Sequence, residues 1–183
     1  MKVVVGITGS SGAIYALDFL RKCTADKYLV VSKWGKVLLR DELNMSEKDL
    51  TPYIKRTFSD DDLTAPTASG SNRFDAFVIV PASTSTIGKI ASGIGDTLIT
   101  RTAQVCLKER YKLILCVRET PMSTVVLEQC ARLSGYGAVI MPISPPLYFV
   151  PKTFDEYMGA FTDRLLSQLG IRTAIGWRAE EFE

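Results

Sequence analysis

Short apolar runs alternate with amphipathic stretches along this chain. The runs are rich in Val, Ile and Leu without polar alternation, which is typical of strands buried on both faces of a parallel sheet. The stretches between them have helical spacing and a length that suits right-handed crossovers, so the pattern predicts an α/β fold. We predict strands at 3–5, 28–31, 76–80, 112–117 and 138–141. Helices are expected from 14, at 33–43, 86–92, 96–109 and 123–133, and from 153 to about 169.

Local signals mark the ends of several elements. Pro81 is expected to stop the third strand. Asp96 is the expected N-cap of the helix 96–109. Thr153 and Glu156 form a T-x-x-E capping box at the start of the last helix. The polar segment 44–72 is expected to be a short helix and a long surface loop.

Composition and charge exclude several classes of protein. The chain has 183 residues, which fits one domain with a sizeable core, and its 46% hydrophobic and 23% charged residues are typical of a globular protein. A formal net charge of +2 gives no overall field that would attract nucleic acid or an anionic membrane. The opening apolar run, MKVVVGITG, is too short for a signal peptide or a membrane span.

Cysteine and histidine usage narrows the chemistry. The four cysteines lie in apolar patterns and never form a C-x-x-C pair, so neither a zinc site nor a disulfide framework is indicated, and a reducing cytoplasm fits best. Histidine is absent, which removes the commonest general acid and base, the serine triad and most sets of metal ligands. Any proton transfer must therefore use Glu, Lys, Tyr, Ser or a cofactor.

Small and hydroxyl-bearing residues follow the first, second and third strands. Parallel strands present their carboxyl ends at one edge of the sheet, where ligands bind, and glycines and helix N-termini there favour an anion. The first loop fits no standard phosphate motif, and its glycines are equally well explained by packing. The hydroxyl run after the third strand exceeds what a helix cap needs, which favours a phosphate or flavin contact. These residues are Gly9, Ser10, Ser11, Ser32, Ser83, Thr84, Ser85 and Thr86.

Arg118 and Glu119 come directly after the strand 112–117, at the same edge. An exposed ion pair contributes little stability and needs no particular position. A charged pair at the ligand-binding end of a buried strand therefore indicates function, with the ligand unspecified.

Taken together, the segments of this chain resemble the flavin prenyltransferases of the UbiX/Pad family, within the superfamily of homo-oligomeric flavin-containing Cys decarboxylases. The resemblance runs from Lys2 to about Ile171. It rests on GITGSSGAIYA, VSKWGK, PTASGS, VPASTSTIGKIASGIGDTLITRTAQVCLKER, CVRETPMS, GAVIMP and PPLYFVP. It implies a Rossmann-like, flavodoxin-type domain at 1–171 with a tail at 172–183. It also implies trimers that assemble into a homododecamer, with the active site where subunits meet.

The resemblance also implies an activity. Such enzymes transfer a dimethylallyl group from dimethylallyl phosphate to reduced FMN, joining it at flavin N5 and C6, and they need no metal. The product, prenylated FMN, serves as cofactor for a UbiD-type decarboxylase. The expected cofactor is thus FMN, and the expected partners are dimethylallyl phosphate, further copies of this chain and that decarboxylase.

Matched by position, the resemblance assigns roles to particular residues. It assigns donor-phosphate contacts to Arg118, Tyr148 and Arg164, and catalytic roles to Ser11, Arg101, Lys108 and Glu119. Contacts with FMN are assigned to Gly9, Ser10, Ser11, Ser32, Ser83, Thr84, Ser85, Thr86 and Arg118.

The chemistry of the reaction agrees with these residue types. Cationic groups can stabilise a leaving phosphate, and a carboxyl such as Glu119, its pKa tuned by burial and by Arg118, can move protons. Ser11 is a plausible relay near flavin N5. Aromatic faces of Tyr148 and Trp177 can stabilise an allylic cation.

Several of these residues also have ordinary structural explanations. Arg101 suits a solvated helix face, and Lys108 suits a helix C-terminus, where cations complement the dipole. Arg164 can pair with the neighbouring Asp163, and Tyr148 can anchor a proline-rich loop.

Two alternative functions remain open. A flavin-dependent decarboxylase of peptidyl or pantothenoyl cysteine has similar loops but relies on a catalytic histidine, which this chain lacks. A non-catalytic FMN-binding protein explains the small-residue loops but leaves the charged residues without a purpose.

Overall fold

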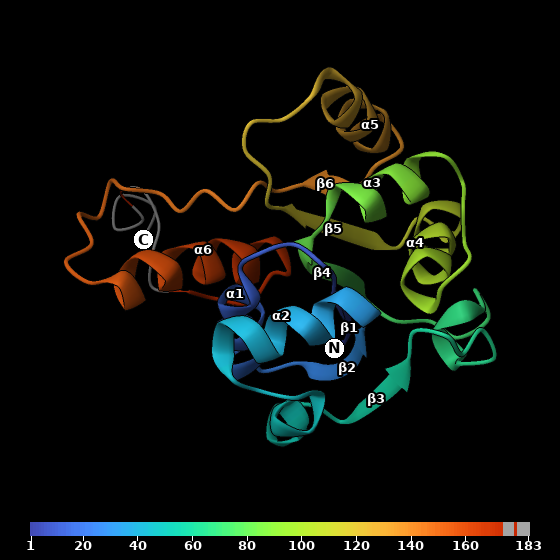
Figure 1. Cartoon of the computed structure of the whole chain (residues 1–183), viewed down its shortest axis with the longest axis horizontal. Helices are drawn as coiled ribbons and strands as arrows, with labels where there is room; N and C mark the ends of the chain where they lie inside the picture. The colour runs from blue at the N-terminus through green and yellow to red at the C-terminus, as the bar shows by residue number, and fades with distance from the viewer. Residues whose placement is uncertain (174–177, 179–183) are drawn as a thin grey trace.

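The computed structural model describes residues 1–173 and 178. In this part of the chain, six strands form one sheet in the order β3-β2-β1-β4-β5-β6, and all neighbours are parallel (Figure 1). The order reverses between β1 and β4, the position where open α/β sheets bind ligands. The strands are β1 Lys2–Ile7, β2 Asp26–Val31, β3 Arg56–Ser59, β4 Ala76–Ala82, β5 Lys112–Val117 and β6 Val139–Ile140.

Helices cover both faces of the sheet, so the fold has three layers (Figure 1). Successive residues of a strand point to opposite faces: Val3 and Val5 pack with α1 and α6, whereas Val4 packs with α3 and α4. The helices are α1 Ala13–Lys22, α2 Lys33–Leu43, α3 Thr84–Ala91, α4 Leu98–Glu109, α5 Thr124–Gly135 and α6 Phe154–Gln168, with 3-10 turns η1 Glu47–Tyr53 and η2 Pro66–Ala68.

The predicted α/β fold with a parallel sheet is confirmed, and two strand predictions are wrong. The segment 44–72 contains β3, an edge strand that pairs with β2. Pro81 does not stop β4, which continues to Ala82 with an irregular register. The carbonyl of Pro81 accepts hydrogen bonds from the backbone N–H of Thr8, at 3.2 Å, and from its hydroxyl, at 2.7 Å. These bonds keep the end of β4 attached to β1.

The cap predictions are partly correct. Thr97, not Asp96, is the N-cap of α4, and its side chain accepts a hydrogen bond from Thr100 N. Thr153 caps α6 as predicted, with Oγ1 3.1 Å from Glu156 N. The carboxylate of Glu156 accepts from the backbone N–H of Lys152, at 2.6 Å, and not from that of Thr153. The predicted box therefore forms in only one direction.

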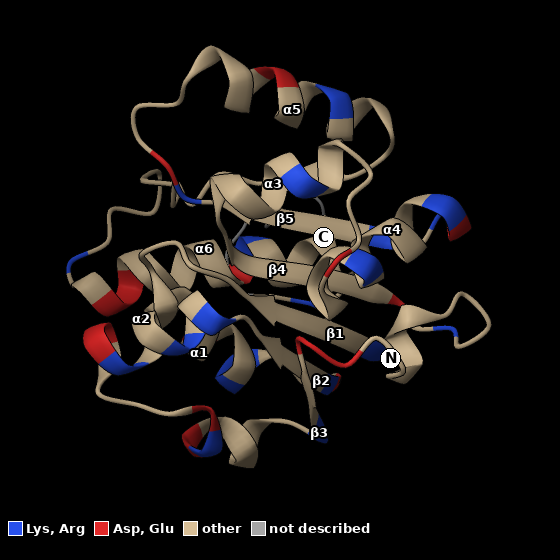
Figure 2. Cartoon of the chain, turned by 45° about the vertical axis from the view of Figure 1, so that its right-hand side comes forward, with Lys and Arg blue, Asp and Glu red and all other residues tan. Residues whose placement is uncertain are grey.

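Basic and acidic residues are interspersed over the helices, and neither sign covers a whole face in the view of Figure 2. Cys106 and Cys116 are among four buried free thiols, and burial raises the pKa of both. The described residues contain no cluster suited to a metal ion and no helix long and apolar enough to cross a membrane. Trp177 and most of the tail expected at 172–183 lie outside the described residues.

Candidate active site

A cavity of about 620 Å³ opens where β1, β2 and β4 end and α2 and α3 begin. The chain thus brings together the small-residue loops that the sequence places after its first three predicted strands, and the end of β5 adds one carboxylate. The predicted site residues that line the cavity are Gly9, Ser10, Ser32, Ser83, Thr84, Ser85, Thr86 and Glu119.

Two hydroxyl groups tie these loops together. The buried Thr8 Oγ1 donates to Pro81 O and accepts from Ser83 N at 2.8 Å, which joins the end of β1 to the start of α3. Ser10 Oγ donates to the carbonyl of Arg118 at 2.6 Å, which joins the first loop to the end of β5. The cavity wall is therefore held together by hydrogen bonds that span 73 to 108 residues of sequence.

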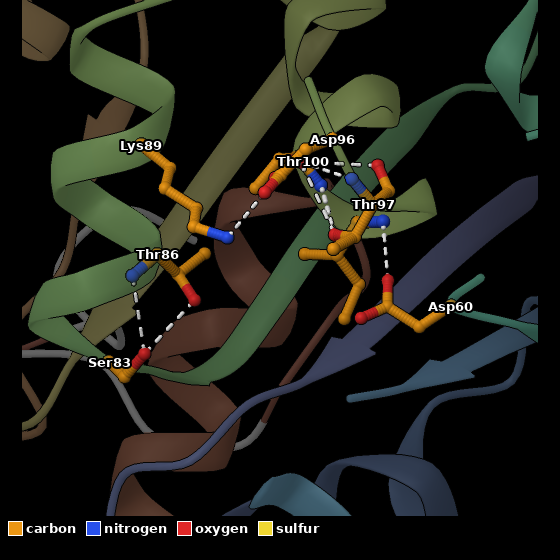
Figure 3. Close-up of polar contacts among 8 residues, drawn as sticks. Asp60, Ser83, Thr86, Lys89, Asp96, Thr97 and Thr100 are labelled. Carbon is orange, nitrogen blue, oxygen red and sulfur yellow. Dashed lines mark hydrogen bonds and ion pairs between the residues drawn. The ribbon is translucent and has the colours of Figure 1, made fainter. Parts of the chain in front are cut away.

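The hydroxyl run at the start of α3 is divided between capping and the cavity. Ser83 is the N-cap, with Oγ 3.3 Å from Thr86 N and 3.0 Å from Thr86 Oγ1 (Figure 3). The hydroxyls of Thr84 and Ser85 line the cavity and make no hydrogen bond within the described part of the chain. These two groups are thus available to a ligand.

The N-terminus of α1, by contrast, already holds an anion. The carboxylate of Glu42, on α2, accepts from Gly12 N at 2.9 Å and from Ala13 N at 2.8 Å. Ser11 is exposed beside this contact and does not line the cavity. This contact of Glu42 was not predicted from the sequence, because the residues around Glu42 carry no signal that its side chain binds a turn 30 residues away.

A polar group on the far wall of the cavity was also missed. Asp60, which follows β3, accepts from Leu98 N through its carbonyl, at 2.7 Å. Its Oδ1 accepts from Ile99 N at 2.9 Å (Figure 3). Burial raises the pKa of the Asp60 carboxyl, although the amide of Ile99 and the side chain of Thr97 act in the opposite direction. Asp60 thus satisfies two free N–H groups in the first turn of α4.

Lys89 and Asp96 form an ion pair at the same wall, with Nζ 2.7 Å from Oδ2 (Figure 3). The hydrogen bond from Lys89 lowers the pKa of the Asp96 carboxyl. Because Asp96 is exposed, the pair positions two side chains more than it stabilises the fold.

Arg118 and Glu119 follow β5 as predicted, and both are exposed in this chain. Glu119 lines the cavity, with Oε1 3.2 Å from the backbone N–H of Thr120, whereas Arg118 does not line it. No ion pair joins the two side chains among the described residues. In a single chain the side chain of Glu119 is therefore not buried.

The other predicted charged residues do not line this cavity. Arg101 Nε donates to the carbonyl of Ala68 at 3.0 Å, so it anchors η2 to α4, and Lys108 pairs with Glu109. Arg164, on α6, donates to Ser167 Oγ at 3.3 Å. In one chain these cations lie apart from the cavity.

Tyr148 is also separate from the cavity. It lies in the irregular segment before α6, with 44% of its surface exposed. Its aromatic ring stands edge-on to that of Phe149, with centroids 6.1 Å apart.

Comparisons with known proteins agree with this architecture. Residues 1–164 match the model of the Flavoprotein family. The flavin prenyltransferase UbiX of Thermoplasma acidophilum is 43% identical over 172 residues, which cover 93% of this chain and 96% of the relative.

Two solved structures are also similar over nearly the whole chain. The crystal structure of AnUbiX in complex with FMN and dimethylallyl pyrophosphate has a TM-score of 0.90 and 32% identity, and covers 97% of this chain and 98% of its own. The dodecameric FMN-dependent UbiX-like decarboxylase from Escherichia coli O157:H7 has a TM-score of 0.92 and 34% identity, with the same coverage. Because identities above 30% extend over almost all of both chains, this protein belongs to the flavoprotein family and, within it, to the flavin prenyltransferases of the UbiX type.

Proposed function

We propose that this protein transfers the dimethylallyl group of dimethylallyl phosphate to N5 and C6 of reduced FMN. The product, prenylated FMN, then passes to a UbiD-type decarboxylase in the cytoplasm. The observation that carries this proposal is the hydroxyl-lined cavity at the carboxyl edge of the sheet, in a chain of the UbiX type. Buried free thiols support the reducing compartment.

The residues of the cavity fit FMN. Ser32 and Ser83 cap α2 and α3, whose N-termini face the cavity and favour an anionic phosphate. Thr84 and Ser85 provide hydroxyls for the phosphate or the ribityl chain. When bound, reduced FMN supplies the nucleophilic N5 and C6 that accept the prenyl group. Gly9 and Ser10 complete the wall beside β1.

Glu119 is the proposed proton-transfer group. Its carboxylate lines the cavity, and a carboxylate in this position can exchange a proton with a bound ligand. Ser11 lies in the first loop and is the proposed relay between flavin N5 and solvent. Joining one allyl group at both N5 and C6 also consumes its double bond, so the group at this position would have to accept the protons displaced from the flavin and return one to the allyl carbon.

The donor phosphate requires positive charge. Breaking its C–O bond develops negative charge on the phosphate and positive charge on the allyl group, so cationic donors and an aromatic face both lower the barrier. Because these groups lie apart from the cavity of one chain, we propose that subunits of a homo-oligomer, a dodecamer built of trimers, complete the site. The proposed groups are Arg101, Lys108, Arg118, Tyr148 and Arg164.

Incubation with reduced FMN under anaerobic conditions tests this proposal. Dimethylallyl phosphate and the corresponding diphosphate are supplied in separate samples, and the flavin is analysed by mass spectrometry. We expect a gain of one prenyl unit with the monophosphate. A flavin of unchanged mass with both donors would overturn the proposal.

The name of the E. coli relative suggests a second candidate, a decarboxylase. The same protein loaded with FMN alone should release no carbon dioxide from phenylacrylic acid or from a peptide with a C-terminal cysteine. Release of carbon dioxide without prenyl transfer would favour the decarboxylase.

A further inference from the structure

Trp34 is an exposed aromatic residue on the wall of the cavity. It is the second residue of α2, and 64% of its surface is exposed. Among the lining residues that the structure describes it is the one aromatic, whereas most others, such as Ser32 and Asp61, are polar. A large aromatic surface at the mouth of a polar cavity suits a ligand with a flat ring.

Backbone packing fixes the start of the Trp34 side chain. A Cβ atom built on Gly9 would lie 2.5 Å from Trp34 Cβ, and one built on Gly35 would lie 2.5 Å from the carbonyl oxygen of Ile7. Only glycines permit this approach of α2 to the end of β1. The hydroxyl of Ser32 accepts from Gly35 N at 3.0 Å and fixes the same turn. The Cα–Cβ bond of Trp34 is thus fixed at the wall of the cavity before any ligand arrives.

We infer that Trp34 is a flavin-binding residue, whose indole packs against the ring system of FMN. The inference rests on the proposed function and deepens it. The hydroxyls of the cavity can hold the phosphate and ribityl chain, but they offer little apolar area to the flavin ring. Stacking on an aromatic side chain supplies that area. Lys33 Nζ lies 5.9 Å from the Trp34 ring centroid, so the ligand ring takes the opposite face of the indole.

Affinity for FMN in three variants tests this role. Trp34→Leu keeps an apolar side chain but removes the aromatic face, whereas Trp34→Phe restores a ring. Tyr136→Leu is the matched control, because Tyr136 is an exposed aromatic residue, 52% exposed, that does not line the cavity. Calorimetric titration with FMN gives the dissociation constant, light scattering gives the assembly size, and the prenylation assay gives the activity.

Because Trp34→Leu removes one stacking face, we expect its dissociation constant for FMN to rise about tenfold. Trp34→Phe keeps an aromatic ring, so its dissociation constant should stay within about threefold of that of the unmodified protein. Tyr136→Leu should bind FMN normally. The size of the assembly should be the same in all variants.

Two results would overturn the inference and leave the proposed function intact. In the first, the unmodified protein prenylates FMN and Trp34→Leu binds FMN equally well. In the second, both Trp34 variants form smaller assemblies and bind FMN equally weakly, which would mean that the indole covers a neighbouring copy. An unmodified protein that binds no FMN would overturn the proposed function as well.

Discussion

Ser10 shows how a hydroxyl at a cavity wall can be committed to the protein itself. Its proton is donated to the carbonyl of Arg118, so toward a ligand Ser10 can only accept a hydrogen bond. Phosphate oxygens need donors, and Thr84 and Ser85 fit that need better. In this chain Ser10 attaches the Arg118–Glu119 turn to the first loop.

Glu119 and Arg118 should have separable effects when substituted. Glu119→Gln keeps the shape of the side chain and removes its capacity to accept a proton. We expect FMN to bind normally and the rate of prenylation to fall about a hundredfold, within the range of general acid–base catalysis. Arg118→Ala should instead weaken FMN binding, because it removes a cationic contact.

Titration with FMN and single-turnover mass spectrometry measure the two effects. The control is Glu128→Gln, an exposed carboxyl on α5 away from the cavity. A normal rate in Glu119→Gln would rule out its role in proton transfer.

At the scale of elements, α4 depends on a residue outside it. The first-turn donors Leu98 N and Ile99 N are satisfied by Asp60, from the loop after β3. This contact joins the edge of the sheet to the helix that carries Arg101 and Lys108. A change at Asp60 therefore acts on the cavity wall and on the position of α4 together.

The half-buried carboxyl of Asp60 predicts a pH dependence of stability. Its pKa is raised in the fold, so the native state holds the proton more tightly than the unfolded chain. Its contribution is fully present below the unfolded pKa, about 3.9, and is lost as pH rises through the folded pKa. The Asp60→Asn variant has no ionisable group at this position, and its side-chain oxygen can still accept the hydrogen bond from Ile99 N. Relative to the unmodified protein, it should gain stability between pH 4 and pH 7.

Asp62→Asn is the matched control for this prediction. Hydrogen bonds from Thr64 lower the pKa of Asp62, so its contribution is present above the unfolded pKa and is lost as pH falls. Compared with the unmodified protein, this variant should therefore be less stable at pH 7, and the difference should be smaller at pH 4. Urea unfolding at the two pH values measures both variants. Equal pH dependence in both would contradict the assignment.

At the scale of the whole molecule, the proposed site is divided. One chain provides the hydroxyl-lined cavity and Glu119, while Arg101, Lys108 and Arg164 lie elsewhere on its surface. The cations that line the cavity of a single chain are Lys33, Lys36 and Lys89, and of these Lys36 pairs with Glu47 and Lys89 with Asp96. The arginines proposed for the leaving phosphate are not among the lining residues. In the proposed homo-oligomer, such groups would reach each cavity from neighbouring copies.

Mixed assemblies test this division. Glu119→Gln and Arg164→Ala each inactivate a different part of the site, so subunits of the two variants should complement each other. Random mixing in equal amounts should restore about a quarter of the sites, since each site then draws an intact residue from each of two chains. The prenylation rate of co-refolded protein is compared with each variant refolded alone. If mixing gave no recovery, the two residues would belong to the same chain's contribution.

Local patterns in the sequence were sufficient for most of the fold. Buried β-branched runs identified β1, β2, β4 and β5, and Thr153 marked the start of α6. These signals depend on neighbours within a few residues, because side-chain periodicity and caps are local properties. The same reasoning located the loops that form the cavity, since parallel strands present their carboxyl ends at one edge.

Tertiary structure decided what local patterns cannot express. The four-residue edge strand β3 has no apolar run of its own and exists because it pairs with β2. Glu42 at the start of α1, Asp60 at the start of α4 and Ser10 on the carbonyl of Arg118 join residues 30 to 108 positions apart. Such contacts depend on the path of the chain, which brings distant groups within hydrogen-bond distance. Sequence alone thus determined the parallel sheet except for β3, most of the helices and the edge at which the cavity opens, and the folded chain decided which side chains share the cavity.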